Sequence, residues 1–142
     1  MRRIAPFIVL ATLLLPAAAA AATSLVSISP QRVNFGTKAV GTTTFKTVTV
    51  RNTSEADLLV HVGGGLPDDF GWGGVPSDSP CVFSPGAVLA PGDSCEVFVR
   101  FSPTEFFAQF GRQTGTLEVT VSDPSTLAVL ETTLITITGT GR

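Results

Sequence analysis

Residues 95–101 read Cys-Glu-Val-Phe-Val-Arg-Phe, and this stretch decides the fold class. Apolar residues occupy every second position, while Glu96 and Arg100 stand between them. Alternation with a period of two is typical of a β-strand that buries one face. Pro103 ends the pattern, because proline cannot donate a hydrogen bond to a sheet. We therefore predict a half-buried strand over residues 95–101.

The same period recurs on both sides of this strand, separated by turn signals such as Pro91-Gly92 and Asp123-Pro124-Ser125. The expected strands cover residues 25–29, 33–35, 45–52, 58–62, 81–83, 95–101, 117–122 and 134–138. The side chains expected to point inward include Val48, Val50, Val60, Val62, Val97, Val99, Phe101, Leu117, Val119, Ile135 and Ile137. Residues 63–80, rich in Gly and Pro, are expected to be irregular. Seven or eight short antiparallel strands without a helix predict an all-β, immunoglobulin-like β-sandwich.

The first 22 residues indicate export. Arg2 and Arg3 precede an apolar run over residues 4–15, and residues 17–22 are alanines that offer cleavage sites. We predict a signal peptide over 1–22 and one domain over 23–142, secreted or periplasmic. The alternative is a membrane anchor, for which the run is short.

The charge of the chain limits the classes of partner that it could bind. Without Arg2 and Arg3 the chain has 7 basic and 11 acidic residues, a formal charge of −4. We therefore expect no basic patch for nucleic acid or an anionic membrane surface, and no membrane span after signal cleavage.

The only cysteines, Cys81 and Cys95, suggest a disulfide that closes a loop of about fifteen residues, worth about 3 kcal/mol. Two free thiols or a metal pair are the alternatives, and the metal pair is disfavoured because His61 is the only histidine.

Several segments in order resemble the ASH-type (abnormal spindle and hydin) immunoglobulin-like family, including its bacterial choice-of-anchor D type. These segments are Val33–Gly36, Val40–Thr42, Val48–Thr53, Leu89–Cys95, Val99–Pro103, Gly115–Leu117, Ser122–Asp123 and Thr138–Gly141. The resemblance implies a seven-stranded sandwich that binds or scaffolds and has no catalytic residues. Its eukaryotic members are associated with cilia, centrosomes and microtubules, and its bacterial members are mostly exported. This chain departs from the family in its Gly-rich loop and in extra loop aromatics.

No catalytic, cofactor or metal site is expected. His61 is expected to be a solvated strand residue, because no nucleophile or acid is arranged beside it and no hydrolase, zinc or phosphate-loop motif occurs. Asp68, Asp69 and Asp78 could supply oxygen ligands to Ca²⁺, but they lack the regular spacing, so a solvated loop is the preferred interpretation. Asn52-Thr-Ser54 matches either a glycosylation acceptor or a turn at the end of a strand, and we favour the turn.

Aromatic residues in the predicted loops provide a more specific hypothesis for binding than the residues considered above. Trp72, Phe106, Phe107 and Phe110, together with Phe70, would form a sticky patch if exposed, or would cap an open end of the sandwich if buried. Our first hypothesis is a noncatalytic interaction or scaffolding module that binds another protein of the envelope or cell surface through loops or a sheet face. The alternative is a carbohydrate-binding or adhesin module in which Trp72 stacks on sugar rings.

Overall fold

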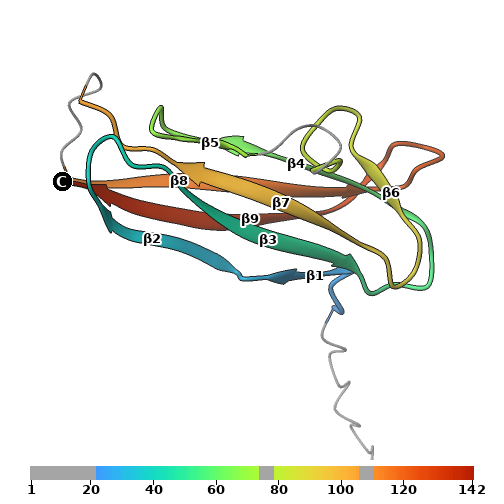
Figure 1. Ribbon diagram of the computed structural model, residues 1–142. Helices are drawn as coiled ribbons and strands as arrows, with labels where there is room; N and C mark the ends of the chain where they lie inside the picture. The colour runs from blue at the N-terminus through green and yellow to red at the C-terminus, as the bar shows by residue number, and fades with distance from the viewer. Residues whose placement is uncertain (1–21, 74–78, 106–110) are drawn as a thin grey trace, which may run out of the picture.

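A computed structural model describes residues 22–73, 79–105 and 111–142. These residues form nine strands and contain no helix, so none there could span a membrane (Figure 1). The strands are β1 Val26–Ser29, β2 Arg32–Lys38, β3 Thr44–Asn52, β4 Leu58–Gly65, β5 Phe70–Trp72, β6 Ala87–Leu89, β7 Ser94–Phe101, β8 Gly111–Ser122 and β9 Val129–Gly141.

The strands make two sheets, in the orders β1-β3-β7-β5 and β2-β9-β8-β4-β6. This confirms the predicted all-β sandwich, with nine strands in place of seven or eight. One pairing differs from the antiparallel expectation, because β2 runs parallel to β9, with Val33 opposite Ile137. The reason lies at Pro30, which separates β1 in the first sheet from β2 in the second. The N-terminal segment thus crosses between sheets without reversing direction.

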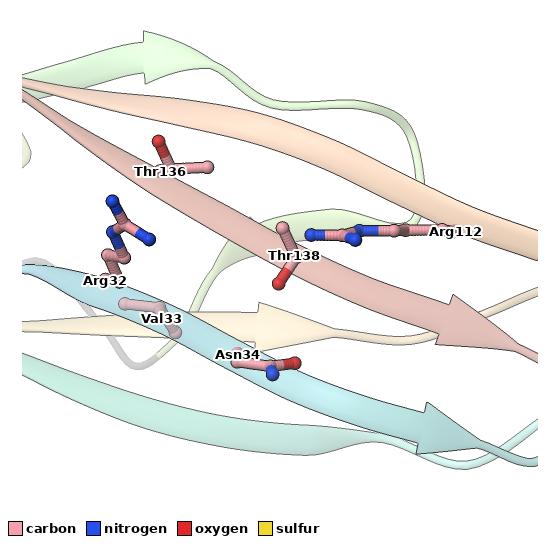
Figure 2. A pocket seen from close by; sticks show the side chains of 6 residues that line it. All are labelled: Arg32, Val33, Asn34, Arg112, Thr136 and Thr138. Atoms are coloured by element: carbon pink, nitrogen blue, oxygen red, sulfur yellow. The ribbon is translucent and has the colours of Figure 1, made fainter.

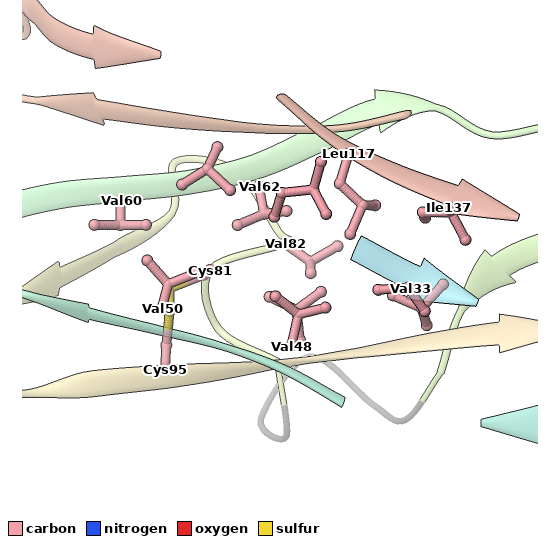
Figure 3. Close-up of a cluster of buried hydrophobic side chains, with 14 of the residues drawn as sticks. Val33, Val48, Val50, Val60, Val62, Cys81, Val82, Cys95, Leu117 and Ile137 are labelled. Carbon is pink, nitrogen blue, oxygen red and sulfur yellow. A yellow bond between two sulfur atoms is a disulfide. The ribbon is translucent and has the colours of Figure 1, made fainter. Parts of the chain in front are cut away.

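The core lies between the two sheets and consists mainly of valine (Figure 3). Val50, Val60, Val97 and Val121 are completely buried, so the period-two assignment of inward faces is confirmed. At one end of the core three aromatic rings pack together, with Phe101 lying 4.7 Å from Phe70 and 5.5 Å from Phe35 between ring centroids. These residues come from β7, β5 and β2, so the cluster joins both sheets.

Two local predictions were wrong. Residues 81–83 form turns and not a strand, since Val82 N–H donates to the Ser79 carbonyl and Gly86 N–H to that of Phe83. The stretch predicted to be irregular contains the end of β4 and all of β5. Gly64 makes this last part of β4 possible. It has a φ of 150°, and a Cβ there would lie 2.1 Å from the Thr116 carbonyl oxygen. Glycine therefore allows β4 to approach β8, where the composition suggested a loop.

The predicted disulfide joins Cys81 to Cys95, with Cα atoms 6.4 Å apart. Cys95 lies on β7 opposite Val50 of β3. Cys81 lies in the turn region before β6, and its carbonyl accepts a hydrogen bond of 2.7 Å from Val62 N–H on β4. The covalent bond therefore connects β7 of the first sheet to a segment that is hydrogen-bonded to the second.

Candidate interaction surfaces

The predicted aromatic surface is only partly described. Phe106, Phe107 and Phe110 lie outside the described residues. Trp72 lies on β5, partly buried and packed against the core, while Phe70 two residues earlier is buried. Phe70 is thus a core residue, as the capping hypothesis expects, and Trp72 is the one member of the predicted partner surface that can be placed.

Asp69, considered above as a calcium ligand, is a buried structural carboxylate. It is 3 % exposed and accepts hydrogen bonds from Thr104 N–H at 3.2 Å, from Thr104 Oγ1 at 3.1 Å and from Gln113 Nε2. Its backbone carbonyl also accepts from Ser102 N–H at 2.7 Å. The expected solvated loop is therefore wrong at Asp69, although Asp68 is exposed.

The calcium hypothesis finds no support in this arrangement. The Asp69 oxygens are directed at protein donors, and Asp78 lies outside the described residues. Within residues 22–73, 79–105 and 111–142, no group of three or more His, Cys, Asp or Glu side chains could hold a metal ion. The carboxylate instead connects the segment before β5 to both ends of the β7–β8 connection.

We expect Asp69→Ala to lower the free energy of unfolding by about 2 kcal/mol, because it leaves the buried donors of Thr104 and Gln113 without their acceptor. Urea denaturation measures the change. Asp68→Ala is the matched control and should stay within about 0.5 kcal/mol of the unmodified protein, since Asp68 is exposed. Equal effects of the two substitutions would contradict the structural role of Asp69.

Asn52 ends β3 as a buried turn residue, which agrees with the preferred interpretation. Its side-chain Nδ2 donates to the carbonyls of Ala56 at 2.7 Å and Leu89 at 2.8 Å, and its Oδ1 accepts from Ser54 N–H and Oγ. The side chain is completely buried. Because this nitrogen is buried and donates to two backbone carbonyls, the folded protein has no room for a glycan on Asn52, and the turn interpretation is favoured.

His61 occupies the outer side of β4, between the buried Val60 and Val62 and opposite Thr120. It is half-buried. In the described part of the chain no hydrogen bond joins its ring to an acidic or nucleophilic side chain. This placement agrees with the prediction of an outward strand histidine.

Exposed apolar side chains gather at one end of the five-stranded sheet. The register places Val88, Leu59, Ser122 and Val129 in one row across β6, β4, β8 and β9. Leu130 follows Val129, and Leu127 lies in the turn before it. We call Leu59, Val88, Leu127, Val129 and Leu130 the apolar end. It lies at the end of the sandwich opposite the C-terminus (Figure 1).

Four of the seven exposed large hydrophobic residues among those described belong to the apolar end, and a fifth, Leu134, lies further along β9. Leu127 and Val129 are 65 % and 61 % exposed. Scattered single apolar residues on a surface are normal, whereas a contiguous set indicates a contact site. The clustering makes this end of the sheet the strongest candidate for a partner surface.

The turn that carries Leu127 is built by Asp123. Its carboxylate accepts hydrogen bonds from Ser125 N–H and Thr126 N–H, both within 2.9 Å. These bonds, that of Thr126 first, hold the pKa of Asp123 below its usual 3.8. The ionised Asp123 carboxylate therefore stabilises the turn at pH values above 3.8. This stabilisation is lost as the pH falls through the lowered pKa. Leu127 has a φ of 60°, a left-handed conformation that a leucine rarely adopts.

Comparison with known families gives a match to the profile described as ASH: Abnormal spindle-like microcephaly-associated, ASPM-SPD-2-Hydin, over residues 23–129. A comparison with curated proteins finds no sequence that matches.

Among solved structures, the chain is similar to the ASH/PapD-like domain 7 of human CEP192, with 16 % identity, a TM-score of 0.62, and coverage of 96 % of this chain and 98 % of that one. It is also similar to the chaperone DraB of E. coli, with 15 % identity, a TM-score of 0.55, and coverage of 80 % and 53 %. A third similar structure is WR4, an MSP family member of C. elegans, with 10 % identity, a TM-score of 0.55, and coverage of 84 % and 100 %. At these identities the likeness concerns the fold alone, and the chain spans about half of DraB.

Proposed function

This chain belongs to the ASH family, and from that premise we propose that it is a noncatalytic module that binds another protein through the apolar end of its five-stranded sheet. Domains of this type are generally protein-interaction modules. A fold alone does not assign a function, so the proposal rests on a particular surface of this chain. The observation that carries it is the gathering of exposed apolar side chains at the apolar end.

The row from Val88 to Val129 gives a partner an apolar strip made by side chains of β6, β4 and β9 and interrupted on β8 by Ser122. Ser122, the polar residue in the row, is itself buried, so it adds little polar surface. Apolar residues at the core of a contact, surrounded by polar residues, are the usual arrangement of protein interfaces. Water leaves such a strip when a partner covers it, which supplies the free energy of association.

Leu127 supports the same proposal from its backbone. A non-glycine residue in the left-handed region costs about 1 kcal/mol, and glycine would avoid this cost. In this turn a leucine occupies the position and exposes most of its side chain. A role in contacting a partner explains why an exposed apolar side chain is kept in a costly backbone conformation. A purely structural role does not explain this combination.

The proposed compartment is the periplasm or the cell exterior, reached with a signal peptide over residues 1–22. The disulfide supports this, because such bonds persist in oxidising compartments. The proposal also includes a partner in the envelope or cell surface and membership of the bacterial choice-of-anchor D type. One similar structure is by its name a chaperone, a class of protein that acts on other proteins.

The function is tested by placing a photo-crosslinking amino acid at position 129 and comparing it with position 47. We expect position 129 to yield discrete protein adducts in cells that produce this chain, because Val129 lies at the apolar end. Thr47 is exposed on β3 of the other sheet and should yield none of these adducts. Mass spectrometry of the adducts identifies the partner.

Leu127→Gly separates binding from folding. It removes the exposed side chain and the backbone cost together, so we expect unchanged or slightly higher stability and a clear loss of the adducts formed from position 129. Thr47→Asp should leave the adducts unchanged. Adducts from position 129 that survive Leu127→Gly together with Leu130→Asp would contradict the proposal. Binding on a glycan array that Trp72→Ala abolishes, with no protein adducts, would favour the carbohydrate-binding alternative.

A further inference from the structure

Two arginines from the strands on either side of β9 line one pocket on the outer face of the five-stranded sheet. The pocket has a volume of about 320 Å³ and is lined by Arg32, Val33, Asn34, Arg112, Thr136 and Thr138. Arg32 extends from β2 and Arg112 from β8, and both reach toward β9, which runs between them (Figure 2). Apart from the buried Val33, the lining consists of hydroxyl, amide and guanidinium groups, so the pocket is polar and positively charged.

Neither arginine is neutralised within the described part of the chain. No ion pair or hydrogen bond engages the side chain of Arg32 or Arg112 there, and no acidic residue lines the pocket. Two cations that face one pocket repel each other, and an anion placed between them would remove this repulsion. The pocket therefore favours a negatively charged ligand.

The surroundings add to this charge. Lys38 ends β2 and Arg142 follows β9, so four cations lie on or next to the same three strands, against two acidic residues on them, Glu118 and Glu131. The chain from residue 23 onward has only 7 basic residues and a formal charge of −4, so this concentration is not an average property of its surface. The low overall charge gives no sign of this local pair of cations, because the sheet order brings together Arg32 and Arg112, which are far apart in sequence.

We propose that this pocket binds the carboxylates of an extended acidic segment of a protein or peptide. Guanidinium groups pair well with carboxylates through two parallel hydrogen bonds. The hydroxyls of Thr136 and Thr138 and the amide of Asn34 can bond to the backbone or remaining oxygens of such a ligand. The inference goes beyond the proposed function, because it concerns the other end of the sheet and does not require the apolar end to bind.

The register favours an extended segment over a single small anion. Arg32 lies level with Thr136, and Arg112 lies level with Thr140 on the opposite side of β9. Four residues along a strand correspond to about 13 Å. The Arg32 side chain extends across the sheet toward Thr136, and the Arg112 side chain extends toward Thr138 (Figure 2). In an extended peptide, alternate side chains on one side are about 7 Å apart. A segment with acidic residues at every second position offers carboxylates about 7 Å and about 13 Å apart, which covers the separations that the two arginines can span.

Nuclear magnetic resonance of the arginine Nε–H groups tests the site, with the blocked pentapeptide Glu-Thr-Glu-Thr-Glu as the probe. We expect saturable shifts of the Arg32 and Arg112 signals. We expect Arg32→Gln or Arg112→Gln to raise the Kd about fivefold each, as for exposed ion pairs, and the double substitution to abolish saturable binding. The peptide Gln-Thr-Gln-Thr-Gln should cause no shifts.

Arg51→Gln is the matched control, because it removes the same charge from an exposed position on the other sheet. It should leave the Kd unchanged. Equal weakening by Arg51→Gln, or no shift at Arg32 and Arg112, would overturn the proposal. A sulfated heparin hexasaccharide is tested separately. Saturable shifts with this hexasaccharide and none with the acidic peptide would overturn the proposal and identify an anionic glycan as the ligand. Leu127→Gly should leave peptide binding intact, which separates this site from the apolar end.

Discussion

Phe101→Ala is expected to lower the free energy of unfolding by about 3–5 kcal/mol. Phe101 is completely buried at the end of β7, and its ring packs against those of Phe35 and Phe70. Those rings come from β2 of one sheet and β5 of the other, so the substitution opens a cavity where the two layers meet. The loss combines the transfer of the ring out of the core with the cavity that it leaves.

Chemical denaturation followed by fluorescence or circular dichroism measures the loss. Phe45→Ala is the matched control, because Phe45 is a phenylalanine on the neighbouring strand β3 but is 56 % exposed. We expect a change below about 1 kcal/mol there. Because the loss at Phe101 approaches the whole stability of many domains, Phe101→Leu provides a milder variant with an intermediate loss. Equal losses at positions 101 and 45 would contradict the description of this cluster.

Gly139 shows what the sequence could not predict about this cluster. The glycines near the C-terminus suggest the end of the domain, yet Gly139 lies inside β9 and is buried. A Cβ there would lie 2.8 Å from two atoms of the Phe101 ring. The small size of Gly139 thus accommodates the largest completely buried side chain. This is a contact between residues 38 positions apart in sequence, which local periodicity does not reveal.

The strands that follow a clean period of two were predicted, and those that depart from it were not. Alternating valines from Val48 to Val121 mark the inner faces directly, because each half-buried strand must turn the same side inward. β5 was missed because Phe70-Gly-Trp72 is too short and too close to glycines to show alternation. The parallel position of β2 was missed because strand order depends on contacts between distant segments, and a proline signals only that a strand ends.

The candidate surfaces were hidden for the same reason. Val88, Leu59 and Val129 form a row only after β6, β4, β8 and β9 are aligned. Arg32 and Arg112 share a pocket only because β9 runs between their strands. Net charge and aromatic residues in loops can be read directly from a sequence. The net charge predicted a surface without basic patches, and the aromatic residues indicated Trp72 as a binding residue. Topology instead assembles an apolar end and a cationic pocket on one face of one sheet.

Replacing both Cys81 and Cys95 by alanine is expected to lower the free energy of unfolding by about 3 kcal/mol, the loop-closure value for about fifteen residues. For a domain of this size the midpoint of thermal unfolding should fall by about 10 °C. The bond connects the turn region before β6 to β7, so its loss removes the covalent connection to the first sheet and leaves the hydrogen bond of 3.3 Å from Phe98 N–H on β7 to Ser79 Oγ. The backbone bond between Val62 and Cys81 remains and keeps the segment next to β4.

Calorimetry with and without a thiol reductant separates the causes of this loss. The reductant should lower the melting temperature of the unmodified protein nearly to that of the double variant, and it should leave the double variant unchanged. Because both cysteines are buried, alanine also removes two sulfur atoms from the core, so any further deficit of the double variant measures packing. A shift below about 2 °C on reduction would mean that contacts such as Val62–Cys81, and not the covalent bond, fix this segment in the fold.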